Sequence, residues 1–296
     1  MPKVFIVVLN WNGYKDTIEC LKSLEKIPEK IEIVVVDNAS TDDSVEKLKK
    51  LAEVIENKSN LGFSGGNNVG IKYALENGAD FVMIINNDTL VDKNIISEFL
   101  RSANKNKDVG IFSPKIYFAK GFEYHKKRYK EQDLGKVIWY AGGEIDWENV
   151  YGKNFGVDEV DKGQFEKDKE IDFATGACMF VRSEVFKQIG MFDERYFAYL
   201  EDADLSLRSK KAGYKILFVS KTMLWHKVSQ SSGIGSDLND YFITRNRLIF
   251  GIAYAPLHSK LALIKESLIF AQVGRKWQIT GARDFYLRRF GKGSWR

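Results

Sequence analysis

The sequence is poor in proline and cysteine and has no long apolar run. Four prolines and two cysteines occur in 296 residues, without a CxxC spacing. Cys20 and Cys178 lie within apolar stretches, which argues against a disulfide framework or a zinc site and predicts two buried free thiols. The longest apolar candidate, 248–257, is well short of the roughly 18 residues that a membrane-spanning helix needs. We therefore expect short linkers, a reducing cytoplasm and no spanning helix.

Two common nucleotide-binding signatures are also absent. Neither GxxxxGK(S/T) nor GxGxxG occurs, so neither phosphate-binding loop is predicted. The apolar run 4–9 is too short for a signal peptide and is better explained as a first strand. Low-complexity segments and internal repeats are missing too. With 44% hydrophobic and 29% charged residues, the composition is that of a globular protein with one substantial core.

Strand and helix patterns alternate through the first half of the chain. The alternation predicts an α/β fold with a mostly parallel sheet flanked by helices. Between about 115 and 170 the pattern breaks, which we interpret as an insertion or lid within a main domain of 1–236. A helical region, 237–296, is expected to follow. Strands are predicted at 3–9, 31–36, 81–85, 109–112, 177–181 and 215–219, helices at 14–24, 42–51, 92–104 and 199–212, and a Gly-rich turn at 60–68 that leads into a helix through Leu75.

The end of the chain is strongly basic. After Pro256, nine lysines and arginines face two acids, Glu266 and Asp284, and alternate with apolar and aromatic residues. This pattern fits either a packed helix with a solvated basic side or an amphipathic surface for anionic lipid headgroups. No nucleic-acid-binding module accompanies it, so nucleic acid is not an expected partner. The expected location is the cytoplasm, including the inner face of the cell membrane under the amphipathic interpretation.

Three polar clusters close strongly apolar strands. They are Asn10-Trp11-Asn12-Gly13, Asp37-Asn38-Ala39-Ser40 and Asn86-Asn87-Asp88. One such cluster is explained by turn and cap chemistry alone. Three in succession favour a shared ligand site, because ligands of open parallel sheets bind beyond the carboxyl ends of the strands.

The residue types near these strand ends suggest separate tasks. Asp37 either caps the next helix or accepts a hydrogen bond from a nucleobase or ribose. Asp88 suits a hard cation such as Mg²⁺ or Mn²⁺, which takes its other ligands from phosphates and water. His226 adds a second ligand or a diphosphate contact, or is structural. The turn with Gly65-Gly66-Asn67 permits close backbone approach to a nucleotide sugar.

Two adjacent carboxylates, Glu201 and Asp202, stand at the start of a predicted helix. The helix dipole alone is a sufficient reason for acids there. Neighbouring helical residues differ by about 100°, so the two side chains cannot point the same way. One can orient while the other enters a cleft, where an ionised carboxylate can take a proton from a hydroxyl.

Taken together and in order, seven motifs resemble the inverting family 2 glycosyltransferases, in particular their rhamnosyltransferase-like branch. The motifs are VVLNWNG (7–13), VVVDNASTDDS (34–44), NLGFSGGNN (60–68), INND (85–88), FATGACMFVR (173–182), FAYLEDADLSLR (197–208) and YFITRNRLIF (241–250). The resemblance implies a GT-A fold with a C-terminal helical extension, a nucleotide-diphosphate sugar donor of the dTDP or UDP type, and inversion at the anomeric carbon. It also implies transfer of rhamnose or another hexose to a hydroxyl of a glycan, polysaccharide or lipid-linked acceptor, with Mg²⁺ or Mn²⁺ as cofactor.

Carried over by position, the resemblance assigns Asp37 to the nucleobase, Asp88 to the metal and Asp202 to the general base, with Glu201 as its orienting partner. The other expected site residues are Asn10, Asn12, Asn38, Gly65, Gly66, Asn67, Asn87 and Arg245 for the donor, Trp139, Gly176 and Tyr199 for the acceptor, and His226 for the metal. Arg245 is alternatively a helix-surface arginine paired with an acid, and Trp139 part of a small lid core.

One position departs from the family pattern. Asn86 stands where the first Asp of the metal motif is usual, and a neutral side chain weakens cation binding. The departure keeps a second interpretation open, a catalytically inactive nucleotide-sugar-binding or scaffold protein. A sugar-nucleotide pyrophosphorylase is disfavoured, because that class carries a Gly-rich, Arg-containing loop where Asn10-Trp11-Asn12-Gly13 stands here. The oligomeric state stays open, a homodimer included.

Overall fold

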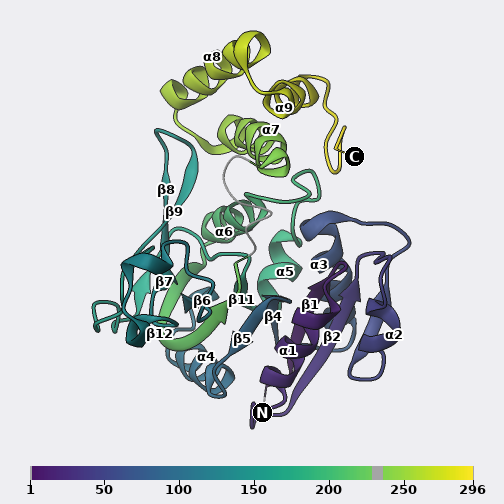
Figure 1. Ribbon diagram of the computed structural model, residues 1–296, viewed down its shortest axis with the longest axis vertical. Helices are drawn as coiled ribbons and strands as arrows, with labels where there is room; N and C mark the ends of the chain where they lie inside the picture. The colour runs from purple at the N-terminus through teal and green to yellow at the C-terminus, as the bar shows by residue number, and fades with distance from the viewer. Residues whose placement is uncertain (1, 229–235, 296) are drawn as a thin grey trace.

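The predicted alternation builds one mixed sheet with helices packed against it (Figure 1). The structure, a computed structural model, describes residues 2–228 and 236–295. Its strands are β1 (Val4–Asn10), β2 (Ile31–Asp37), β3 (Glu53–Glu56), β4 (Phe81–Asn86), β5 (Thr89–Val91), β6 (Val109–Phe118), β7 (Ile138–Tyr140), β8 (Gly143–Asp146), β9 (Tyr151–Asn154), β10 (Lys169–Glu170), β11 (Cys178–Arg182) and β12 (Lys215–His226). The main sheet runs β10-β12-β6-β11-β4-β1-β2-β3, with β5 on β12 and β7 on β6, while β8 and β9 form a separate hairpin.

The centre of the sheet consists of the Val- and Ile-rich runs. β1 lies between β2 and β4 and pairs in parallel with both. β11 pairs antiparallel with β4 and β6, and β12 returns parallel to β6. β1 and β4 are buried along almost their whole length, as strands covered on both faces should be. Cys20 and Cys178 are free and buried, as predicted.

Helices connect the strands and cover the sheet. They are α1 (Tyr14–Leu24), α2 (Ser44–Leu48), α3 (Gly62–Glu76), α4 (Ile95–Lys105), α5 (Ser183–Ile189), α6 (Glu201–Lys211), α7 (Asp237–Tyr254), α8 (Leu257–Val273) and α9 (Lys276–Tyr286). α3 packs on β1 and β2, whereas α4 and α6 pack on β6 and β12.

The start of α3 corrects the predicted Gly-rich turn. The helix already begins at Gly62, so most of the expected turn is helical. A Cβ on Gly66 would lie 2.4 Å from Leu9 Cδ1, and one on Gly70 would lie 2.3 Å from Val7 Cγ1. The glycines therefore let α3 lie close against β1. The hydrophobic periodicity of a helix is weak where glycines form the face that packs on the sheet. The start of α3 was therefore predicted too late in the chain.

Other differences between prediction and structure concern missed elements and the ends of two strands. β3, β5 and α5 have no predicted counterpart, and β6 and β12 extend beyond their predicted ends. β6 continues past Pro114, which cannot donate a ladder hydrogen bond. The β6–β12 register shifts next to this proline, between Val219 and Met223, so the irregularity accommodates it.

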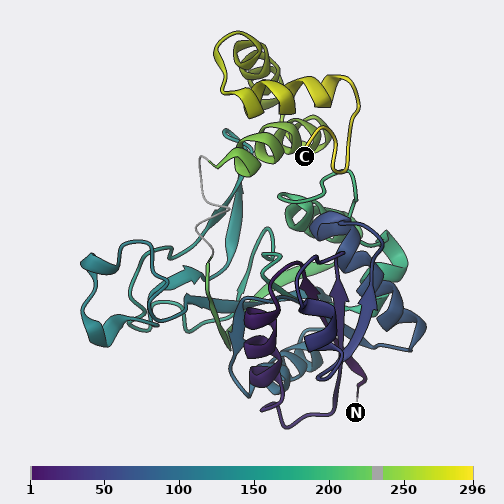
Figure 2. The same ribbon diagram turned by 45° about the vertical axis from the view of Figure 1, so that its right-hand side comes forward.

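The segment 115–170 is tied into the fold at several points. β7 pairs with β6, and β10, at the end of the segment, pairs with β12. The β8–β9 hairpin reaches α7, where Arg247 donates to the Asn149 carbonyl at 2.7 Å and Phe250 stacks on Trp147 (Figure 1). The rest of the segment projects beside the sheet (Figure 2).

α7, α8 and α9 form a layer at the end of the molecule opposite the N-terminus (Figures 1 and 2). α7 packs against both other helices. Asp284 of α9 accepts hydrogen bonds from the Tyr241 hydroxyl of α7 at 2.6 Å and from the Ser294 N–H at 2.8 Å. Among the described residues, no helix is long and apolar enough to cross a membrane.

Candidate active site

The ends of three neighbouring strands meet at one edge of the sheet. Asn10 of β1 is the register partner of Asp37 of β2, and Leu9 of β1 is the partner of Asn86 of β4. The polar clusters that follow these strands therefore lie side by side, as the strand-end argument requires.

Asp37 is the centre of a buried hydrogen-bond network. Its Oδ1 accepts from Asn10 Nδ2 at 2.8 Å and from Ser40 Oγ at 2.7 Å, and its Oδ2 accepts from the Ser40 N–H at 2.9 Å. Asn12 continues the network, because its Oδ1 accepts from the Thr41 N–H at 2.7 Å. The carboxylate is held in place, and Oδ2 retains acceptor capacity for a further donor.

Asn38 uses its whole amide inside the protein. Its Nδ2 donates to Asn60 Oδ1 and to the Gly62 carbonyl, and its Oδ1 accepts from Asn57 Nδ2 and the Leu61 N–H, all at 3.0 Å. Asn38 therefore ties the end of β2 to the start of α3.

Four other residues predicted to bind the donor also face protein. A Cβ on Gly65 would lie 2.8 Å from that of Leu61, and Gly66 faces β1. Asn67 is buried and donates to the Phe63 carbonyl at 2.9 Å. Asn87 donates to Thr17 Oγ1 at 3.0 Å. The geometry gives these four residues packing and support roles, because none of them lines the cleft that opens beside them.

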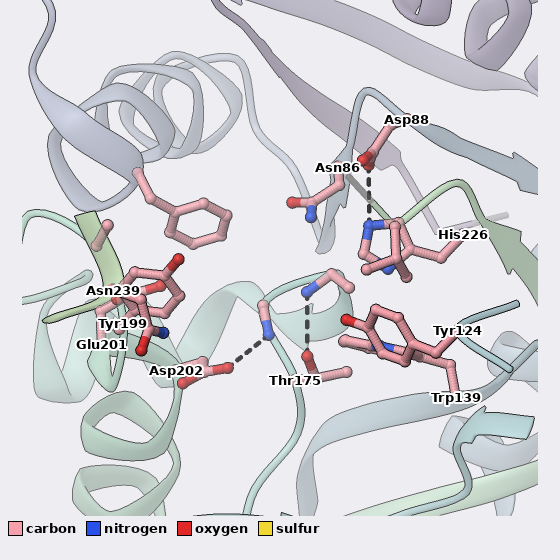
Figure 3. A pocket seen from close by; sticks show the side chains of 15 residues that line it. Asn86, Asp88, Tyr124, Trp139, Thr175, Tyr199, Glu201, Asp202, His226 and Asn239 are labelled. Carbon is pink, nitrogen blue, oxygen red and sulfur yellow. Dashed lines mark hydrogen bonds and ion pairs between the residues drawn. The ribbon is translucent and has the colours of Figure 1, made fainter. Parts of the chain in front are cut away.

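That cleft has a volume of about 410 Å³ and is shown in Figure 3. It brings together predicted residues that are far apart in the sequence. Its lining consists of Phe63, Asn86, Asp88, Tyr124, Trp139, Thr175, Gly176, Ala177, Ala198, Tyr199, Glu201, Asp202, His226, Val228 and Asn239. All the residues predicted for catalysis, metal and acceptor share this one space.

One side of the cleft carries Asp88 and His226. His226 Nε2 lies 3.0 Å from Asp88 Oδ1, and Trp139 packs edge-to-face on the imidazole with 4.9 Å between ring centroids. The close contact lacks hydrogen-bond geometry. Among the described residues, neither Asp88 Oδ1 nor His226 Nδ1 has a hydrogen-bond partner, although both are buried. An orphaned carboxylate oxygen beside an imidazole nitrogen fits a shared divalent cation.

The protein by itself does not complete such a metal site. Among the described residues, no three His, Cys, Asp or Glu side chains come together as a ligand group. A cation held by Asp88 and His226 therefore needs ligands from a bound diphosphate and water, as Mg²⁺ and Mn²⁺ sites on nucleotides often do.

The other side of the cleft carries the carboxylate pair at the start of α6 (Figure 3). Asp202 Oδ2 accepts from the Gly176 N–H and Oδ1 from the Ala203 N–H, both at 2.8 Å. Burial raises the pKa of Asp202, and these N–H groups oppose the rise. Burial and the Asp202 charge raise the pKa of Glu201 well above its ordinary value. Glu201 Oε2 is buried and has no hydrogen-bond partner within the part of the chain that the structure describes. Of the two carboxyl groups, Glu201 therefore holds its proton more strongly, and Asp202 is the one that ionises first.

Replacing Glu201 with glutamine is expected to change how stability depends on pH. The folded-state pKa lies above the ordinary value of 4.5, so the contribution of Glu201 to stability is lost as pH rises through the folded-state pKa. Glutamine keeps the shape of the neutral acid without titrating. The Tm of Glu201→Gln should therefore rise relative to that of the wild type as the pH is raised from about 4.5 through the neutral range, measured by calorimetry. A difference that stays constant over this range would contradict a protonated Glu201.

The loop before the carboxylate pair has an unusual backbone. Phe197, Tyr199 and Leu200 have φ values of 63°, 70° and 70°. Side chains other than glycine rarely adopt this left-handed region, so surrounding contacts must hold the loop.

Asn246 of α7 supplies those contacts. Its Nδ2 donates to three loop carbonyls, at 2.9 Å for Tyr196, 2.7 Å for Ala198 and 2.9 Å for Tyr199. Its Oδ1 accepts from Arg245 Nε at 3.1 Å. One buried amide thus fixes the approach to the carboxylate pair.

Arg245 lies away from the cleft, contrary to both sequence interpretations. Its side chain is fully buried, so it has no exposed surface with which to bind a donor or pair with a solvent-facing acid. The guanidinium donates to the carbonyls of Arg195, Tyr196 and Gly291 at 3.1, 3.0 and 2.7 Å. Arg245 therefore joins the loop before α6 to the C-terminal segment, a role that only the packing of distant segments reveals.

Replacing Asn246 with alanine is expected to lower both stability and turnover. The change removes one buried donor that three loop carbonyls share, while Arg245 still donates to the Tyr196 carbonyl, and the loss should cost about 2–4 kcal/mol of unfolding free energy. Denaturant unfolding measures this, and kcat should fall more than the apparent affinity for donor. Asn77→Ala, which removes an exposed amide that bonds within its own helix end, is the matched control. Equal effects of the two variants would argue against the loop-holding role.

Seven cleft residues were not predicted from the sequence, and among them Phe63, Tyr124, Thr175 and Asn239 bring larger or polar side chains. Thr175 precedes Gly176 within a matching motif, so the motif already contained a signal for it. Phe63 enters from the first turn of α3, Tyr124 from the segment without a clear pattern, and Asn239 from α7. Phe63, like Thr175, stands in one of the seven motifs, whereas Tyr124 and Asn239 lie outside all of them and have no local signal in the sequence.

Comparison with family models identifies the chain. A model described as glycosyl transferase family 2 matches residues 5–190, and one described as glycosyl transferase family group 2 matches residues 147–288. The first covers more than half of the sequence, and the chain therefore belongs to glycosyl transferase family 2. The predicted family is confirmed.

Curated relatives carry glycosyltransferase names. The low-salt glycan biosynthesis hexosyltransferase Agl10 of Haloferax volcanii is 28% identical over 218 residues, which cover 71% of this chain and 62% of the relative. The N-acetylglucosaminyl-diphospho-decaprenol L-rhamnosyltransferase of Mycobacterium tuberculosis is 25% identical over 214 residues, 69% of this chain and 68% of the relative. The chain thus spans about two thirds of the length of these relatives. The rhamnosyltransferase-like resemblance is confirmed by these names.

Solved structures confirm the GT-A fold. GalNAc-T7, solved with UDP, GalNAc and Mn²⁺, superposes with a TM-score of 0.64 at 16% identity, over 90% of this chain and 54% of that one. The mannosyltransferase PcManGT of Pyrobaculum calidifontis, in complex with GDP-Man and Mn²⁺, gives a TM-score of 0.57 at 15% identity, over 97% and 74%.

Proposed function

We propose that the chain is an inverting glycosyltransferase that moves rhamnose, or another hexose, from a dTDP- or UDP-sugar to a hydroxyl of a lipid-linked glycan or polysaccharide. One observation carries the proposal. The Asp88–His226 pair faces the charged Asp202 across a single cleft (Figure 3). Relatives named as rhamnosyltransferases, including a decaprenol-linked one and the dTDP-rhamnosyl transferase RfbF of Shigella flexneri, support the donor and acceptor classes.

Asp202 acts as the general base in this proposal. Its carboxylate takes the proton of the acceptor hydroxyl while that oxygen forms a bond to C1 of the sugar. The bond from C1 to the diphosphate oxygen breaks, and its electron pair leaves with the nucleoside diphosphate. The Gly176 and Ala203 N–H groups hold the carboxylate in place, and the raised pKa of Glu201 disfavours a second charge beside it. A single displacement of this kind inverts C1.

Asp88 and His226 would hold a divalent cation against the donor diphosphate. When bound, the cation stabilises the negative charge of the leaving group. The imidazole ligand favours Mn²⁺ over the harder Mg²⁺. Asn86 lies in the same lining and can add a neutral oxygen. The buried Asp37 network completes the proposal as the nucleoside-binding end.

A donor panel tests the proposal. We expect one of the dTDP-, UDP- and GDP-sugars to raise the Tm in the presence of Mn²⁺, because a ligand that binds only the folded chain stabilises it. The same donor should be consumed when a diphospholipid-linked glycan is supplied, measured by release of the nucleoside diphosphate. Binding without release, over all acceptors tested, would favour the catalytically inactive alternative. Absence of any Tm shift would remove the donor site itself.

A further inference from the structure

The outward side of α8 is apolar and uncovered. Its inward side packs Ser259, Leu263 and Ser267 into the protein, where all three are buried. The outer face of α8, by contrast, exposes 73% of Leu257, 59% of Leu261, 57% of Leu268 and 78% of Val273, and Ile264 and Ile269 are exposed beside them. Figures 1 and 2 show α8 at the extreme end of the molecule, so this face points away from the rest of the protein.

The charges around this face are of one sign. Lys265 is exposed between Leu261 and Leu268, one helical turn from each. The acid of α8, Glu266, is turned inward and pairs with Arg247 at 2.9 Å. After Pro256 the chain has nine lysines and arginines against two acids, a net +7, while the whole chain has +5. The basic charge of this protein is therefore concentrated in the segment after Pro256.

We propose that the outer face of α8 docks on an anionic lipid bilayer and lies in its interface. An exposed apolar helix face that includes a lysine, on a helix whose acid is paired with an arginine, fits the pattern of interfacial helices. The lysine stems can cover apolar surface while their ammonium groups reach the lipid phosphates. The 17 residues of α8 make a rod of about 25 Å, long enough for a shallow in-plane contact.

The charge distribution also decides against a second copy of this chain as the occupant. Two copies that met through this face would bring two basic C-terminal regions together, and like charges repel. A bilayer with anionic headgroups offers the opposite sign. α7 packs against α8 and contributes Asn239 to the cleft, so docking would place the active site one helix away from the bilayer. The inference itself needs no particular donor or acceptor.

Vesicle sedimentation of the full chain tests the proposal. Vesicles of phosphatidylcholine alone are compared with vesicles that also contain phosphatidylglycerol, at low and at high salt. We expect binding to the anionic vesicles that weakens with salt. The double variant Leu261→Gln with Leu268→Gln should bind about tenfold more weakly, because two side chains lose their apolar burial. Lys265→Glu should weaken binding to anionic vesicles and leave any binding to neutral vesicles unchanged.

The matched control changes two exposed apolar residues elsewhere, Leu51→Gln with Val157→Gln, and should bind like the wild type. The Tm of every variant is measured to confirm folding. The proposal is overturned if the wild type fails to bind anionic vesicles at low salt, or if the double variant binds as well as the control. It is also overturned if sedimentation velocity shows a wild-type dimer that the double variant dissociates, since a second copy would then cover the face. The donor-panel result does not affect any of these outcomes.

Discussion

Asp202→Asn is expected to abolish sugar transfer while leaving donor binding intact. Loss of a general base lowers the rate by about 10²- to 10⁴-fold. Asp202 lies across the cleft from Asp88 and His226, so the donor diphosphate should lose no contact. Turnover at saturating donor measures the first effect, and the donor-induced rise in Tm measures the second.

The same variant carries a predictable structural cost. Both carboxylate oxygens of Asp202 accept backbone N–H groups, so an amide must present its NH₂ to one of them. One buried hydrogen bond is lost, at about 1–3 kcal/mol. Removal of the charge beside Glu201 offsets part of this cost. Activity must therefore be measured well below the Tm of the variant.

Asp108→Asn is the matched control for Asp202→Asn. Asp108 is an exposed aspartate that pairs with Lys215 at 2.8 Å, outside the cleft. The control should keep wild-type turnover. Robust transfer by Asp202→Asn would show that another group takes the acceptor proton, and Glu201 would be the first candidate.

Asp88→Asn is expected to weaken cation binding and, with it, transfer. At an effective dielectric constant of about 20, a unit charge pair 4 Å apart contributes about 4 kcal/mol, and a divalent ion more. The cation concentration for half-maximal activity should rise at least about a hundredfold. Titration of activity with Mn²⁺ gives this value directly. Because the Asp37 network lies outside the cleft lining, a nucleoside without phosphates should bind the variant as it binds the wild type.

Asn86→Asp provides the opposite change in the same cleft. A carboxylate near Asp88 adds a charged ligand, so Mn²⁺ should bind more tightly than in the wild type. The two variants should move the Mn²⁺ titration in opposite directions. If neither variant moves it, Asp88 is not a cation ligand and transfer does not depend on this pair.

The elements that the sequence predicted well are those with strong local signals. Runs of Val and Ile bounded by Asx residues located β1, β2 and β4, and the acids after Leu200 located the start of α6. The misplaced start of α3 has the opposite cause. The buried positions of that helix between Gly62 and Gly70 are glycine, serine or asparagine, so hydrophobic periodicity cannot indicate it.

The sequence by itself determined that polar strand ends and an acid pair exist. Ordered motifs then indicated the family, because their spacing follows the chain. Only the tertiary structure decided which of those residues share a space. Asp88 and His226 meet because β5, which follows Asp88, pairs with the end of β12. Arg245, in contrast, lies in the interior, where its guanidinium donates to carbonyls of two distant segments.

The settings of the three aspartates were likewise decided by the tertiary structure. Asp37 is held in a hydrogen-bond network, and Asp88 has an oxygen without a hydrogen-bond partner among the described residues, beside an imidazole. Asp202 is held by two N–H groups next to Glu201, whose pKa burial raises. Burial and the directions of N–H groups produce these differences, and both depend on segments far apart in the sequence. Residue type and order in the sequence could therefore identify the candidate site residues. Only the packing of the folded chain could show which contacts each of them makes.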